Sequence, residues 1–104
     1  MIKHVVLFKL KAGISWDDPI TAQAVRMAAR VGDEVSDLLS WETGRNISTR
    51  DIAYDFLVIG KVADEAALQR YLFHPFHQEA VILWRQISDW IMIDVPEEAD
   101  VHAI

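Results

Sequence analysis

The segment from Tyr71 to His77 contains the residues best suited to chemistry, a phenol and two imidazoles around a proline. Histidine titrates near neutral pH, so His77 could act as a general base. The hydroxyl of Tyr71 could donate a hydrogen bond to negative charge that develops on a substrate oxygen. The His74-Pro75 step predicts a break between two helices, because the residue before proline disfavours helical geometry. A histidine at such a break often only caps the helix, and the pattern alone favours that structural role over catalysis.

His4 is the third candidate. It is polar among apolar neighbours on a predicted strand at residues 2–10, on the face that we expect under the helices. A buried imidazole needs a hydrogen-bond partner. One interpretation is a satisfied core histidine, and the other is that His4 meets Tyr71 or His77 in a pocket. The expected walls of that pocket are apolar: Val6, Phe8, Phe56, Val58 and Met92.

The sequence predicts neither a metal site nor a cofactor. His74 and His77 have a spacing that suits two metal ligands only on one continuous helix, which Pro75 interrupts. There is no cysteine in the chain, and no carboxylate stands at a matching ligand spacing. Phosphate-binding glycine loops, dinucleotide fingerprints and the Gly-x-Ser-x-Gly elbow are absent as well. The four tryptophans (Trp16, Trp41, Trp84, Trp90) are interpreted as core or interface anchors.

Length and composition indicate one globular domain. The chain has 104 residues, of which 52% are hydrophobic and 25% charged. A net charge of -6 argues against nucleic acid and anionic membranes as partners. No apolar stretch approaches the roughly 18 residues that cross a bilayer. We therefore expect a soluble, cytoplasmic protein.

The hydrophobic periodicity predicts an α+β fold in the order β-α-β-β-α-β, the ferredoxin-like unit with a four-stranded antiparallel sheet. The expected strands are residues 2–10, 41–47, 53–62 and 90–95. The Asp18-Pro19 signal starts a helix whose apolar stripe extends to Leu38, Asp64 caps a second helix through Leu72, and a third runs from Pro75 to Ile87. Residues 1–96 form the domain, and 97–104 an acidic tail.

Apolar residues on both faces of this sheet predict a partner. Helices cover one face only, yet the other would carry Val5, Leu7, Leu57, Ile59, Ile91 and Ile93. A second copy that packs sheet to sheet would bury this surface by symmetry, so we expect a homodimer.

Several segments resemble the stress-responsive dimeric A/B barrel (Dabb) family. Tyr71 to His77 resembles its Tyr-x-x-His-Pro-x-His signature, and residues 4–10 resemble its opening strand. Gly44-Arg45-Asn46 falls at the family's second strand, and Ile93-Asp94 resembles its last. The resemblance implies a dimeric α+β barrel.

The same resemblance implies two classes of function. Most members have no assigned activity, and plant members are associated with stress or defence. One plant member is a cofactor-free polyketide cyclase, and the positions that match its site are Tyr71, His77 and His4. In that reading His77 removes a proton next to a carbonyl and Tyr71 stabilises the enolate. The first class is a small dimeric stress protein with a pocket for a small apolar or carbonyl-bearing molecule. The alternative is a cyclase-like or monooxygenase-like enzyme that uses Tyr71 and His77 as an acid/base pair.

Overall fold

The computed structural model describes residues 1–97, so the predicted acidic tail lies outside the described residues from position 98 onward. The helices and strands are, in chain order, β1 (Ile2–Leu10), α1 (Pro19–Glu34), β2 (Ser40–Arg45), β3 (Phe56–Val62), α2 (Glu65–Phe73), α3 (Pro75–Ile87) and β4 (Ser88–Pro96).

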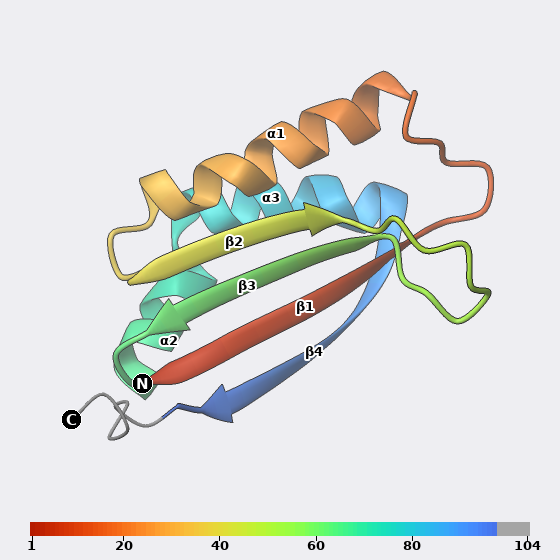
Figure 1. Ribbon diagram of the computed structural model, residues 1–104. Helices are drawn as coiled ribbons and strands as arrows, with labels where there is room; N and C mark the ends of the chain where they lie inside the picture. Colours follow the sequence, from red (N-terminus) through yellow and green to blue (C-terminus); the bar gives the residue numbers. More distant parts are fainter. Residues whose placement is uncertain (98–104) are drawn as a thin grey trace.

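The four strands form one antiparallel sheet in the order β2-β3-β1-β4, and the helices lie against one of its faces (Figure 1). This arrangement is ferredoxin-like and confirms the predicted α+β class. On β1 the residues expected under the helices are buried, and His4, Val6 and Phe8 are each less than a tenth exposed. The predicted alternation of strand faces is therefore confirmed there.

The break between α2 and α3 is fixed by local chemistry. Pro75 is the first residue of α3, and His74 before it has an extended backbone. The Nδ1 atom of His74 accepts a hydrogen bond from the backbone N–H of Phe76 at 3.1 Å. This cap ends α2 just after Tyr71 and starts α3 just before His77, which brings these two side chains to one corner.

At α1 the C-terminal end and the cap hydrogen bond differ from the prediction, while the start at Pro19 is confirmed. The helix ends at Glu34 and not at Leu38, because Val35 already has an extended backbone. Asp18 does occupy the N-cap position, but its carboxylate accepts from the backbone N–H of Ser15 at 2.8 Å instead of from the helix.

The middle strands are shorter than the pattern predicts. β2 ends at Arg45, because the side-chain amide of Asn46 forms a turn: its Oδ1 accepts from Ser48 N and its Nδ2 donates to Ser48 O. β3 starts at Phe56, and the carboxylate of Asp55 just before it accepts a hydrogen bond from the backbone N–H of Leu10.

Two tryptophans attach α1 to the layers below it. The indole N–H groups of Trp41 and Trp84 donate to the carbonyls of Ala28 and Ala24, at 2.8 and 3.1 Å. Gly32 permits the contact on one side, because a Cβ there would lie 2.7 Å from Trp41. α1 continues through Gly32 without a break.

Candidate functional site

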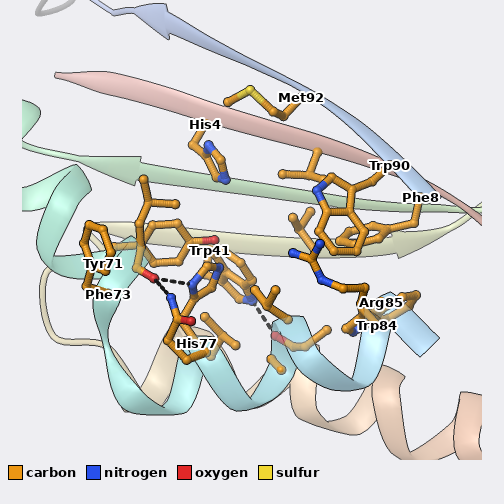
Figure 2. Close-up of a pocket in the computed structure, with 18 residues that line it drawn as sticks. His4, Phe8, Trp41, Tyr71, Phe73, His77, Trp84, Arg85, Trp90 and Met92 are labelled. Carbon is orange, nitrogen blue, oxygen red and sulfur yellow. Dashed lines mark hydrogen bonds between the residues drawn. The ribbon is translucent and has the colours of Figure 1, made fainter. Parts of the chain in front are cut away.

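A cavity of about 380 Å³ lies between the inner face of the sheet and the helices (Figure 2). Its volume falls within the range of small-molecule sites, roughly 300 to 1,000 Å³. Aromatic side chains form much of its wall: Phe8, Trp41, Trp84 and Trp90. The few polar groups among these apolar walls are therefore the ones that would orient a ligand.

The structure brings most of the predicted site residues together at this cavity. They come from β1, β3, β4, α2 and α3: His4, Val6, Phe8, Val58, Tyr71, His77 and Met92. Phe56 is the exception. Its side chain stacks on Trp84 with ring centroids 4.9 Å apart and belongs to the buried core, so it does not line the cavity.

Tyr71 lies between the two imidazoles and is 1% exposed. Its ring centroid is 4.3 Å from that of His77 and 5.3 Å from that of His4. Burial raises the pKa of the Tyr71 hydroxyl well above its ordinary value, and the negative charge of Asp94 raises it further. The phenol therefore keeps its proton near neutral pH and can serve as a hydrogen-bond donor.

The ring of His77 is held by the end of α2. Its Nδ1 lies 3.0 Å from the carbonyl oxygen of Leu72, and because a carbonyl only accepts, Nδ1 carries the proton. Burial lowers the pKa of His77; the Leu72 carbonyl opposes this shift, and the nearby His4 and His74 add to the lowering. His77 is therefore neutral near pH 7, with the lone pair on Nε2, which is the form that a general base requires.

His4 is oriented by a carboxylate on the neighbouring strand. His4 and Asp94 are direct partners in the β1–β4 register, and their Nδ1 and Oδ1 atoms lie 2.5 Å apart. An ionised carboxylate only accepts, so it places the proton of a neutral His4 on Nδ1 and the lone pair on Nε2. Figure 2 shows His4 pointing from the sheet into the cavity, opposite the helix that carries His77.

His74 stands apart from this group. Its imidazole caps α3 through Phe76 and is not among the residues that line the cavity. Bonding a backbone group is the structural role that the sequence pattern favours for a histidine at this corner; His74 takes it at the start of α3, and His77 also bonds a backbone group, the Leu72 carbonyl near the end of α2.

Three polar residues at the site escape prediction from the sequence: Asp94, Arg85 and Gln78, which lines the cavity one position after His77 and donates to the Leu72 carbonyl at 2.6 Å. Asp94 follows from the register of β1 and β4, which a single sequence does not supply. Arg85 lines the cavity from α3, eight positions after His77 and directly after Trp84. Helical spacing offers a signal for Arg85, since positions 77, 81, 84 and 85 share one face of a helix.

Two features are absent from the described part of the chain, residues 1–97. None of its helices has both the length and the apolar character to cross a membrane. No three or more of its histidine, aspartate and glutamate side chains are grouped as metal ligands would be.

Comparisons with known proteins agree with this fold. An uncharacterized protein of Streptomyces coelicolor is 46% identical over 94 residues, which cover 90% of this chain and 97% of that protein. A Dabb family protein of Mesorhizobium loti with a ferredoxin-like fold is 27% identical, with a TM-score of 0.77 and coverage of 94% and 97% of the two chains. A dimeric ferredoxin-like protein of unknown function from Thermobifida fusca has a TM-score of 0.80 at 20% identity, covering 90% of this chain and 88% of its own. The family model for the stress responsive A/B barrel domain matches residues 2–97, and the chain belongs to this family, Dabb.

Proposed function

We propose that this protein is a homodimer that binds a small apolar carbonyl compound in the cavity between sheet and helices. The observation that carries the proposal is that the Tyr71 hydroxyl and the imidazoles of His4 and His77 converge on one cavity with aromatic walls. A closed and filled interior at this place would instead favour a purely structural role for these side chains.

A carbonyl group suits the polar side of this cavity. Tyr71 lines the cavity, and within residues 1–97 the structure gives its hydroxyl no hydrogen bond to the protein, while the hydroxyl oxygen itself is not fully buried. A hydroxyl that faces the cavity without a protein acceptor can donate its hydrogen bond to a ligand oxygen there. The raised pKa of Tyr71 keeps the proton available for such an acceptor. A ketone or aldehyde oxygen accepts one hydrogen bond without bringing a buried charge.

The homodimer rests on the sheet face that the helices leave uncovered. The strand register aligns two aliphatic rows across it, Ile59-Val5-Ile93 and Leu57-Leu7-Ile91. Ile91 and Ile93 are 53% and 57% exposed in the single chain. Lysines border the rows at Lys3 and Lys61, which leaves a compact apolar patch with a charged rim. The Thermobifida fusca neighbour, described as dimeric, supports this assembly.

Proton transfer next to the bound carbonyl is a second candidate function. The specific observation that favours it is the neutral His77 with its lone pair on Nε2, beside a tyrosine that keeps its proton. In such a step Nε2 would take a proton from the carbon next to the carbonyl, while the Tyr71 hydroxyl stabilises the enolate oxygen. This is the chemistry shared by cyclase-like aldol reactions.

Calorimetric titration with the neutral ketone butyrophenone tests the proposal. We expect the wild-type protein to bind it and Tyr71→Phe, which keeps the ring, to bind it about three- to tenfold more weakly. Tyr54→Phe is the matched control, because it removes a hydroxyl that does not line the cavity, and it should bind like the wild type. Failure of butyrophenone to bind, or equal binding by wild type and Tyr71→Phe, would contradict the proposal.

The proton-transfer candidate has a separate readout. In heavy water, NMR should show that the protein accelerates deuterium uptake at the carbon next to the carbonyl of butyrophenone. Binding without any acceleration would leave the binding function standing and remove the catalytic one.

A further inference from the structure

Resting on the proposed function, we infer that the natural ligand carries a carboxylate as well as a carbonyl group, and that Arg85 binds this carboxylate. The cavity then takes an apolar keto acid whose carbonyl lies at Tyr71 and whose acid group lies nearer the C-terminal end of α3.

The first observation is the charge of the cavity wall. Of the described residues that line the cavity, Arg85 is the one with a permanent charge, and no aspartate or glutamate is among them. Within residues 1–97 no carboxylate lies within ion-pair distance of its guanidinium. A guanidinium without a protein partner in such a place offers parallel N–H donors to a planar acid.

The second observation is how the side chain is held. The guanidinium carbon of Arg85 lies 5.2 Å from the ring centroid of Trp90, which itself lines the cavity. This contact supports the cation against the aromatic face and leaves its N–H edge free to donate. Figure 2 shows the side chain running from α3 toward the middle of the cavity. Arg85 is thus directed at the ligand space, although it is exposed to solvent at the rim.

The third observation sets the order of groups in the ligand. His77 and Arg85 lie on one face of α3, eight residues apart, which separates their backbone levels by about 12 Å. Helical side chains lean toward the N-terminus, and because the arginine side chain is the longer of the two, the Arg85 guanidinium reaches further back along the helix than the imidazole of His77 does. A chain of a few methylene groups between carbonyl and carboxylate fits that arrangement, with an apolar end against the aromatic walls.

The net negative charge of the chain sharpens the test of Arg85 as a carboxylate-binding residue. The chain carries a net charge of -6, which repels anions at long range. A preference for an acid over its neutral analogue therefore has to come from a local group.

Paired ligands test the assignment. The probes are 4-oxo-4-phenylbutanoate, 5-oxo-5-phenylpentanoate and 6-oxo-6-phenylhexanoate, each compared with its neutral primary amide, and butyrophenone as the uncharged reference. We expect the wild type to bind at least one acid about tenfold more tightly than its amide. Arg85→Met should abolish this preference while amide affinity stays within twofold. Arg26→Met is the matched control, because it removes an equal charge from an exposed position of α1 outside the cavity, and it should keep the preference.

The outcomes separate the two proposals. If butyrophenone or the amides bind but no acid binds more tightly, or if Arg85→Met keeps the acid preference, the Arg85 assignment is overturned and the proposed function stands. If none of the probes binds, both are overturned.

Discussion

The Nδ1 atom of His77 lies 3.0 Å from the carbonyl oxygen of Leu72, five residues earlier and across the break between two helices. This hydrogen bond serves structure and chemistry together. It ties the start of α3 to the end of α2, and it fixes the proton on Nδ1 so that Nε2 is the basic atom. The two roles of His77 can be separated, because they belong to different nitrogen atoms.

His77→Asn separates them, since an asparagine amide can donate from nearly the position of Nδ1 but has no equivalent of Nε2. We expect His77→Asn to lose less than about 1 kcal/mol of unfolding free energy, whereas His77→Ala leaves the Leu72 carbonyl with one donor fewer and loses about 1 to 3 kcal/mol. Denaturant unfolding of both variants checks this. Equal losses in the two variants would show that the hydrogen bond to Leu72 does not stabilise the corner.

The stability of the protein should depend on pH through His77. Burial lowers its pKa in the folded state below the ordinary 6.5, so between these two values the unfolded chain binds more protons than the folded one. The free energy of unfolding should therefore fall as pH drops below about 6.5, and this contribution should level off below the folded pKa. Thermal unfolding of wild type and His77→Asn from about pH 8 to pH 5 isolates the contribution. Parallel curves for the two proteins would contradict the lowered pKa.

The proposed dimer predicts different results for two isoleucines of similar exposure. Ile93 lies on the uncovered sheet face and is 57% exposed, while Ile82 lies on α3 and is 63% exposed. Ile93→Glu should convert the dimer to monomer, because it places a charge in an interface expected to bury about 1,500 Å² or more. Ile82→Glu should still sediment as a dimer. Sedimentation measures both, and a wild type that is a well-folded monomer at micromolar concentration would exclude the dimer.

Gly32 should be intolerant of a methyl group. A Cβ at this position would lie 2.7 Å from three atoms of Trp41, among them its Cβ and Cγ, which cannot move without the strand. We expect Gly32→Ala to lower the free energy of unfolding by about 1 to 3 kcal/mol through overpacking, despite the better helix propensity of alanine. A Gly32→Ala protein as stable as wild type would show that Trp41 has freedom to shift.

The sequence predicts the fold well where the signal is periodic or local. Alternation on β1 places His4, Val6 and Phe8 on the inner face, and the proline at position 75 marks the helix break. Strand ends are predicted less well, because side chains such as that of Asn46 close turns that hydrophobic patterns do not show.

The candidate site is predictable only in part, for a geometric reason. The alternation of side chains along the strand correctly places Phe56 on the inner face of the sheet. Whether a residue on that face lines the cavity or packs in the filled core depends on which helix side chain lies above it. Above Phe56 lies Trp84, and the space is closed. Asp94 meets His4 through strand register, and Arg85 reaches the cavity through helix orientation; both depend on contacts between distant parts of the chain.

The most direct test of the central claim is the ¹³C NMR signal of the carbonyl carbon in labelled butyrophenone bound to the protein. A hydrogen bond from the Tyr71 hydroxyl should move this signal downfield of its position in an apolar solvent, and Tyr71→Phe should reverse most of the movement while Tyr54→Phe leaves it in place. A bound signal at the same position in wild type and Tyr71→Phe, or the absence of a bound signal in the wild type, would contradict the assignment of this cavity to a carbonyl ligand.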